Sequence, residues 1–212
     1  MKLYFFPPSP NVRKVNAVIS HLGIRDIDRE IVNVARGEQR LPAFLAINPM
    51  GKLPALDAGD GLFLWESNAI CQFLCERRGD TSFYPRDSRV RADIARWLFW
   101  EASAWSAATT ILTTENVRKP MLGIGEPDPA SVMEGEEKFR PLASLLNDQL
   151  ASRPFLVGDA VTLADFVVGG SATYMERGRF PVADFPNLRA WWARLHRIAA
   201  WSASIPSPDL PE

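Results

Sequence analysis

The chain of 212 residues is poor in the side chains that most often carry metal and redox chemistry: it has two histidines and two cysteines. His21 and His196 are distant in the sequence and match neither a metal-ligand spacing nor a triad pattern. Cys71 and Cys75 are four positions apart, which is neither a C-x-x-C redox pair nor a zinc knuckle. We therefore expect buried cysteines that act as small hydrophobes, no bound metal, and a reduced, cytoplasmic setting.

An excess of charge and long apolar runs are also missing. The chain has 24 basic and 25 acidic side chains, which gives a net charge of -1 at pH 7. Nucleic-acid binding needs a basic surface, so we expect no nucleic-acid partner. No apolar run approaches the roughly 18 residues of a membrane-spanning helix, and the short run after Lys2 is too short for a signal peptide.

Strand and helix signals alternate over residues 1–79, which predicts an α/β domain. Strands are expected at 2–6, 26–32, 53–56 and 62–65, and helices at 12–22, 41–47 and 68–77. The segment "DAGDG" between the last two strands is typical of a hairpin turn. The resulting order, βαβ, a short helix and then ββα, predicts a mixed sheet with helices packed on it.

The second part of the chain has almost no strand signal. Residues 80–87 lie in the polar stretch "RGDTSFYPRDS" and are predicted to be a linker, followed by an all-helical domain at 88–212. Helices are expected at 88–115, 131–150, 163–176 and 188–198, with a loop at 118–130. The tail "SIPSPDLPE" is rich in proline and is expected to be weakly ordered.

A serine stands between the first expected strand and the first expected helix, in "YFFPPSPNVRKV". Proline suits the first position of a helix, so Pro10 makes Ser9 the natural N-cap. Ser9 could serve only as a cap. Its O–H would nevertheless stay free to donate to a thiolate held at the positive end of the helix.

Two further segments could bind a peptide-like ligand. In "NPMGKLPAL", a cis Leu53–Pro54 bond would leave the Leu53 backbone groups available to an extended peptide, whereas a plain trans turn would have no such role. In "LWESNAI", the Glu66 carboxylate could pair with an amine. The helix that begins there could hold a carboxylate, although Ser67 could also be a simple N-cap.

Together, "SPNVRKV", "GEQRLPAFLAINPMGKLPAL", "WESNAI" and "GDAVTLADF" give the chain a resemblance to the soluble glutathione S-transferases over essentially its whole length. The match is to a bacterial-style, serine-type member, theta- or nu-like. It implies a thioredoxin-like N-terminal domain that binds glutathione, an all-helical C-terminal domain and a homodimer. The last segment resembles the family's helix-capping motif, in which Thr162 and Asp165 form a capping box that serves folding.

The resemblance also assigns roles to individual residues. Ser9 matches the catalytic serine of the serine-type classes, and Asn11 stands where disulfide-reducing members with a "TPN" pattern depend on an asparagine. The cysteine of the beta class is replaced by Pro10, so cysteine chemistry is not expected. From the glycine end of glutathione to its γ-glutamyl end, the implied binding residues are Gln39, Lys52, Leu53, Pro54, Glu66 and Ser67.

The implied activity is attack of a glutathione thiolate on small hydrophobic electrophiles, a detoxification reaction that uses glutathione as co-substrate. Two alternatives stay open, glutathione-dependent reduction of disulfides or peroxides and a non-catalytic binding or regulatory role. The electrophile pocket is expected to consist of Pro7, Pro8, Trp100, Ser103, Ala104, Trp105 and Met121, with ordinary core packing as the alternative for the tryptophans.

Overall fold

The computed structural model describes residues 1–79 and 81–206, which form two compact units. One unit contains Met1–Asp80 together with the C-terminal segment that begins at Ala199. The other contains Thr81–Ile198. The expected division into an α/β domain and a helical domain is thus present. The segment from residue 199 was expected in the helical domain, but it packs with the first unit.

The first unit is built on a four-stranded mixed sheet with the order β2-β1-β3-β4. Strand β1 (Lys2–Phe5) is parallel to β2 (Asp28–Ile31) and antiparallel to β3 (Ala55–Asp57), which pairs antiparallel with β4 (Phe63–Trp65). A parallel pair needs a crossover connection, and a helix between β1 and β2 supplies it. All four expected strands and the hairpin are confirmed, with ends shifted by at most two residues.

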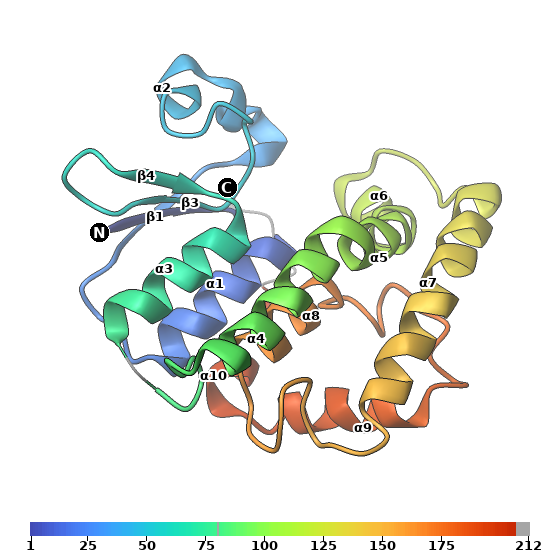
Figure 1. Cartoon of the computed structure of the whole chain (residues 1–212). Coiled ribbons are helices and arrows are strands. Elements are labelled where there is room, and N and C mark those ends of the chain that lie inside the picture. The colour runs from blue at the N-terminus through green and yellow to red at the C-terminus, as the bar shows by residue number, and fades with distance from the viewer. Residues whose placement is uncertain (80, 207–212) are drawn as a thin grey trace. The chain divides into compact units, whose positions relative to one another are not determined.

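Helices cover both faces of this sheet (Figure 1). Helices α1 (Pro10–His21) and α3 (Ser67–Arg78) pack against one face, and the short helix α2 (Pro42–Leu45) lies on the other. Two 3-10 turns, Val34–Arg36 and Glu38–Arg40, precede α2. The α1 side chains that face the core are fully or almost fully buried: Val12, Val15, Ala17, Val18 and Ile19.

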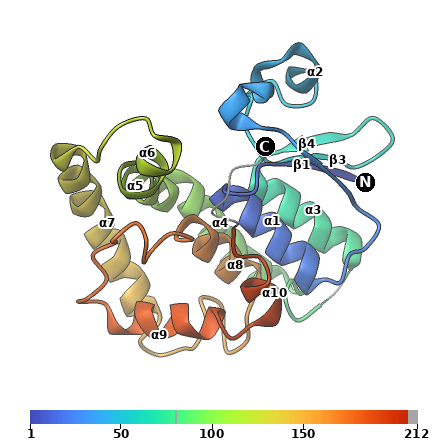
Figure 2. The same ribbon diagram turned by 180° about the vertical axis from the view of Figure 1, so that it is seen from behind.

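The last described helix, α10 (Ala199–Ser202), packs against α1 (Figure 2). Trp201 is fully buried, and the Arg13 guanidinium lies 4.1 Å from the centre of its ring. This cation–π contact joins residues that are far apart in the sequence. The local sequence pattern therefore could not assign this segment to the first unit. Most of the tail that was expected to be weakly ordered, residues 207–212, lies outside the described residues, as does Asp80.

The helical unit begins with one long helical run, from residue 88 to residue 122. It consists of α4 (Ser88–Trp100), α5 (Ser106–Thr113) and α6 (Lys119–Leu122), which are joined by π-helical turns at Glu101–Trp105 and Thr114–Arg118. The loop that was expected to start at residue 118 therefore starts at residue 123. A proline usually ends a helix, but the run continues through Pro120, directly after a wide π turn.

Three more helices complete this unit: α7 (Pro129–Gln149), α8 (Leu163–Ser171) and α9 (Pro186–Leu195). The expected helices are confirmed here, although α8 gives way to turns after residue 171, five residues before its expected end. Aromatic side chains dominate the core. Trp105 lies 5.0 Å from Phe139 between ring centres, and Phe83 lies at the same distance from Phe166.

Candidate active site

Ser9 occupies the N-cap position of α1, as expected, with an extended backbone (φ -74°, ψ 125°) and Pro10 behind it at the helix start. Its backbone carbonyl accepts a hydrogen bond from the Arg13 N–H at 3.1 Å. The side chain, however, makes no capping hydrogen bond. The expectation that the hydroxyl itself caps the helix is therefore wrong, and the half-buried O–H remains available at the positive end of α1.

Ser67 and Asn11 come together although they are 56 positions apart. The Ser67 hydroxyl, which is almost buried, donates to Asn11 Oδ1 at 3.5 Å. Ser67 is the first residue of α3, and the N-cap position before it belongs to Glu66. The starts of α1 and α3, each with its own unpaired backbone N–H groups, thus meet in one region.

Glu66 has an unusual backbone conformation, with φ at +69° and ψ at +111°. A positive φ is unfavourable for a residue with a side chain, and such strain is concentrated at functional sites. The side chain is exposed and makes no capping bond to α3. The strained turn therefore leaves a carboxylate exposed directly before the helix N-terminus.

The Leu53–Pro54 peptide bond is cis, as required for the peptide-clamp interpretation. Strand β3 begins only at Ala55. Neither the Leu53 N–H nor its C=O has a hydrogen-bond partner among the described residues. An extended ligand backbone could therefore pair with Leu53 as an added strand.

The turn before Leu53 is organised by Asn48, a residue that sequence reasoning did not single out. Its buried amide donates to the Lys52 carbonyl at 2.6 Å and accepts from the Met50 N–H at 3.0 Å. Asparagine commonly organises turns through such local side-chain bonds, so the "NP" dipeptide was the available signal. Asn48 fixes the backbone from which Lys52 extends into solvent, and no described carboxylate pairs with that lysine.

Gln39 lies close to this turn, in the second 3-10 turn. Gly51 has a φ of +60°, and a side chain there would meet the Gln39 carbonyl oxygen at 3.0 Å, so glycine permits this close approach. The side-chain oxygen of Gln39 is buried and has no hydrogen-bond partner among the described atoms. A buried orphan acceptor is costly, so the amide suits a ligand that supplies a donor.

The other expected pocket residues of the first unit are the two prolines before Ser9. Pro7 is half-buried and lines a cavity within this unit, whereas Pro8 is buried.

In the helical unit, Trp105 has no exposed surface, its indole N–H donates to the Val168 carbonyl at 3.0 Å, and its ring packs on Phe139. Trp105 therefore belongs to the core of this unit, which is the alternative role considered for the tryptophans. The remaining expected pocket residues of this unit keep some exposed surface: Trp100, Ser103, Ala104 and Met121.

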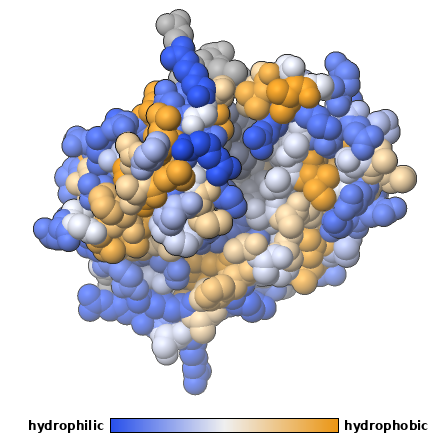
Figure 3. All heavy atoms as spheres, turned by 90° about the horizontal axis from the view of Figure 1, so that it is seen from above, coloured by the Kyte–Doolittle hydropathy of each residue, from blue (hydrophilic) through white to orange (hydrophobic). Residues whose placement is uncertain are grey.

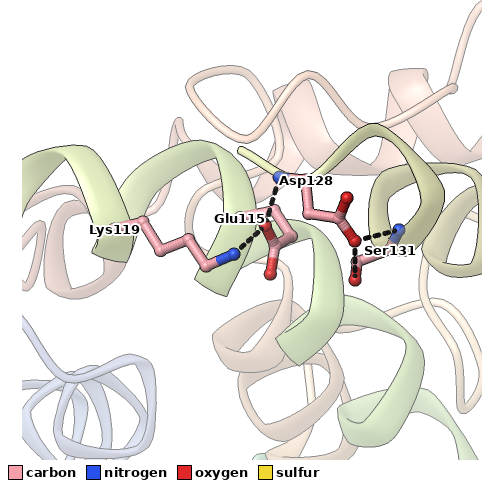
Figure 4. A network of polar contacts seen from close by, with 4 residues as sticks. All are labelled: Glu115, Lys119, Asp128 and Ser131. Atoms are coloured by element: carbon pink, nitrogen blue, oxygen red, sulfur yellow. Dashed lines mark hydrogen bonds and ion pairs between the residues drawn. The ribbon is translucent and has the colours of Figure 1, made fainter. Parts of the chain in front are cut away.

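A polar network fixes the loop that follows Met121 (Figure 4). Glu115, in the second π turn, is almost buried and accepts hydrogen bonds from Lys119 Nζ at 2.5 Å and from the Asp128 N–H at 2.7 Å. The Lys119 bond, followed by the Asp128 N–H, lowers the pKa of Glu115. Asp128 in turn accepts from the Ser131 hydroxyl and N–H at the start of α7. Sequence reasoning did not single out Glu115: its i,i+4 spacing to Lys119 was a local signal, whereas its bond to the Asp128 N–H, 13 positions away, was not.

The predicted capping box is confirmed at the start of α8. The fully buried Asp165 accepts from the Thr162 N–H and hydroxyl, the Leu156 N–H and the Trp191 indole. Burial raises the pKa of Asp165 to about 6, although its four donors oppose that shift. Its four donors all belong to the protein fold, so this carboxylate ties the start of α8 to Leu156 and to Trp191 of α9.

No group of three or more His, Cys, Asp or Glu side chains in residues 1–79 and 81–206 could hold a metal ion. Over the same ranges, no helix has both the length and the apolar character needed to cross a bilayer. Cys71 and Cys75 are buried as expected and form no disulfide.

Family models match both units of the chain. The glutathione S-transferase N-terminal domain matches residues 3–82, and the C-terminal domain matches residues 104–198. A probable glutathione S-transferase GSTF2 of Oryza sativa subsp. japonica is 33% identical over 199 residues, covering 92% of this chain and 91% of its own. A glutathione S-transferase of Hyoscyamus muticus is 32% identical over 211 residues, covering 97% of both chains.

Solved structures agree with these matches. Glutathione transferase F2 from Populus trichocarpa superposes with a TM-score of 0.87 at 25% identity and covers 96% of both chains. Glutathione S-transferase III in its apo form gives 0.84 at 32% identity and covers 99% of both. A glutathione S-transferase I bound with lactoylglutathione gives 0.84 at 27% identity, covering 96% of this chain and 97% of its own. With both domains matched and relatives above 30% identity along nearly the whole sequence, this chain belongs to the glutathione S-transferase family.

Proposed function

We propose that this glutathione transferase uses the Ser9 hydroxyl to stabilise the thiolate of glutathione, which then attacks small hydrophobic electrophiles. The observation that carries the proposal is the state of the Ser9 side chain. It lies at the N-terminus of α1 and makes no capping hydrogen bond to that helix. A donor O–H and the positive end of a helix both favour the ionised thiol.

Glutathione binds in an extended pose across the first unit. Its cysteinyl backbone pairs with Leu53, next to the cis-proline Pro54, and the unused backbone groups of Leu53 support this pairing. Its γ-glutamyl end lies at Glu66 and Ser67, where the carboxylate and a helix start suit the two charges of an amino-acid end. The glycine end lies near Lys52, a cation for its carboxylate, and near the Gln39 side-chain oxygen, an unsatisfied acceptor for the glycyl N–H.

A second candidate activity is glutathione-dependent reduction of disulfides or peroxides, with Asn11 as the residue that acts on the thiol. The observation that favours it is the contact between Asn11 and Ser67, which brings the amide to the start of both helices. For the first candidate, the electrophile-pocket residues expected from the sequence stay a prediction, except Trp105, which has no exposed surface.

The enzyme acts in the cytoplasm as a homodimer. Large apolar side chains remain exposed in each unit, and they support a subunit interface. In the first unit they include Met50, Phe63 and Trp65, and in the helical unit they include Phe99 and Leu145. Figure 3 shows hydrophobic residues reaching the surface among hydrophilic ones on the face that it views.

Two assays run side by side separate the candidate activities. Conjugation of glutathione to chlorodinitrobenzene and reduction of a mixed glutathione disulfide are measured for the native enzyme, Ser9→Ala and Asn11→Ala. The proposal expects conjugation in the native enzyme and its loss in Ser9→Ala. Robust disulfide reduction that depends on Asn11, without conjugation, would replace the first candidate by the second.

A further inference from the structure

The edge strand β2 carries an arginine on the side of the sheet that faces the helices. Arg29 is paired in register with Leu3 of the parallel neighbour β1, so both side chains point to the same face. Leu3 is fully buried on that face. Consistently, Arg29 Nη1 donates a hydrogen bond to Asn16 Oδ1 of α1 at 2.8 Å. Arg29 itself is exposed, because β2 lies at the edge of the sheet, so solvent and ligands can reach its guanidinium.

The charge of Arg29 has no carboxylate partner among the described residues. Its contacts there are the neutral amide of Asn16 and the ring of Phe5, whose centre lies 6.0 Å from the guanidinium carbon. The adjacent Glu30 pairs instead with Lys2. A guanidinium pairs best with a carboxylate or phosphate through two parallel hydrogen bonds. None of the described residues forms such a bidentate pair with Arg29.

A cavity of about 330 Å³ lies beside this arginine, entirely within the first unit. Its lining residues belong to β1, the loop after β1, α1, β2 and the segment that follows α10. Its lining residues are Phe5, Pro7, Asn16, Ser20, Arg29, Ala203, Ser204, Ile205 and Pro206. Pockets for small ligands typically start at roughly 300 Å³, so the size is sufficient for one small molecule.

The polar side chains of this cavity are mainly hydrogen-bond donors. The Asn16 carbonyl oxygen already accepts from Arg29, which leaves its NH₂ group as the unused part of the amide. The Ser20 hydroxyl has no partner among the described residues. The Ser204 hydroxyl, in contrast, is occupied, because it donates to the Trp201 carbonyl at 2.7 Å. Hydrogen-bond donors arranged around a cation favour an anionic ligand.

The rest of the lining is apolar, with Phe5, Pro7, Ile205 and Pro206 as its larger members. We propose that this cavity binds a small monocarboxylate with an aromatic or branched aliphatic body, whose carboxylate pairs with Arg29 and Asn16 and whose body packs on Phe5 and Ile205. Asn16, Ser20 and Arg29 have no part in the proposed glutathione site. Pro7 lies two residues before Ser9, so the ligand contacts the loop that leads to the thiol.

Another role for Arg29 is conceivable on physical grounds. Edge strands often carry inward-pointing charges that discourage pairing with another chain, and that role needs no ligand. It predicts that replacing Arg29 leaves the affinity for anions unchanged. The ligand site predicts a loss of affinity, so one binding measurement separates the two.

The probe is 2-naphthoate, titrated by calorimetry into the full-length enzyme at saturating glutathione. Arg29→Gln should weaken binding about ten- to a hundredfold, the usual effect of losing one hydrogen bond to a charged group. Asn16→Asp should remove binding as well, because a carboxylate next to Arg29 would neutralise it from within the fold. The matched control is Arg25→Gln, an exposed arginine of the same unit outside the cavity lining, which should bind like the native enzyme.

Two further measurements test whether the probe binds through its carboxylate to Arg29. The neutral analogue 2-naphthamide should bind weakly, and equally to the native enzyme and Arg29→Gln. Turnover without naphthoate should be unchanged in Arg29→Gln. Equal affinity of naphthoate for the native enzyme, Arg29→Gln and Asn16→Asp, or no binding at all, overturns the proposal.

Discussion

Replacing Ser9 by alanine should slow the conjugation reaction while it leaves the free energy of unfolding nearly unchanged. Loss of an N-cap side chain costs about 0.5–2 kcal/mol when its oxygen caps the helix. In this structure the Ser9 side chain makes no such bond, so the free energy of unfolding should change by less than about 0.5 kcal/mol. Urea unfolding of Ser9→Ala and the native enzyme measures this difference.

The same change should have a large effect on bound glutathione. A free thiol has a pKa of about 8.5, and one pKa unit corresponds to about 1.4 kcal/mol. A hydrogen bond to a charged group contributes about 1.5–3 kcal/mol, and a helix N-terminus about 0.3–1. Ser9→Ala removes the first contribution and keeps the second, so the thiol pKa should rise by about one to two units. Conjugation at pH 7 should fall roughly three- to twentyfold and recover as the pH rises.

The assay is the ultraviolet absorbance of the bound thiolate as a function of pH. Ser9→Thr keeps the hydroxyl and serves as the matched control, and it should titrate close to the native enzyme. If Ser9→Ala titrates like the native enzyme while Asn11→Ala does not, Asn11 and not Ser9 stabilises the thiolate. That result would refute the proposed role of Ser9. A loss of stability well above 1 kcal/mol in Ser9→Ala would contradict the unused-hydroxyl argument separately.

Four further outcomes are expected. Ser67→Ala should weaken glutathione binding several-fold in calorimetry, and an unchanged affinity would refute the γ-glutamyl placement. Asp165 has a folded pKa of about 6, above its ordinary 3.8, so its contribution to stability is full below about pH 4 and is lost as the pH rises through 6. Against Asp165→Asn, which cannot ionise, the native enzyme should therefore lose about 3 kcal/mol of relative stability across that window in urea unfolding; a flat difference would contradict this. Glu115→Ala should speed hydrogen exchange at the Asp128 amide, whereas a change at the exposed Glu134 should not. Trp65→Asp should shift the proposed dimer toward monomer in light scattering, and an unaltered mass would exclude this side chain from the interface.

Local sequence signals correctly predicted most elements of this fold. The "DAGDG" turn predicted the β3–β4 hairpin, and Pro10 marked the start of α1. Thr162 and Asp165 predicted the capping box of α8 because both partners lie within one helical turn. The mixed character of the sheet followed from the order of elements along the chain, whereas the strand order β2-β1-β3-β4 was not predicted. The theta- or nu-like class, the linker and the homodimer stay predictions.

Other features depend on contacts between distant parts of the chain, and the local pattern could not contain them. The helical run passes Pro120 within a segment that is tied to Asp128 through Glu115. Residues 199–206 join the first unit, where Trp201 packs on Arg13, 188 positions earlier in the sequence. Both outcomes are decided by packing energy, which depends on neighbours in space.

The candidate site divides in the same way. The sequence alone identified Ser9, Leu53, Glu66 and Ser67 as candidates, because each stands at a turn or helix start whose chemistry is local. Only the tertiary structure decided how these groups are used. The Ser9 hydroxyl makes no capping hydrogen bond, and the Ser67 hydroxyl donates to Asn11. Likewise, only the fold could reveal that Arg29 pairs with Asn16 and has no carboxylate partner among the described residues, because such partners are set by neighbours in space.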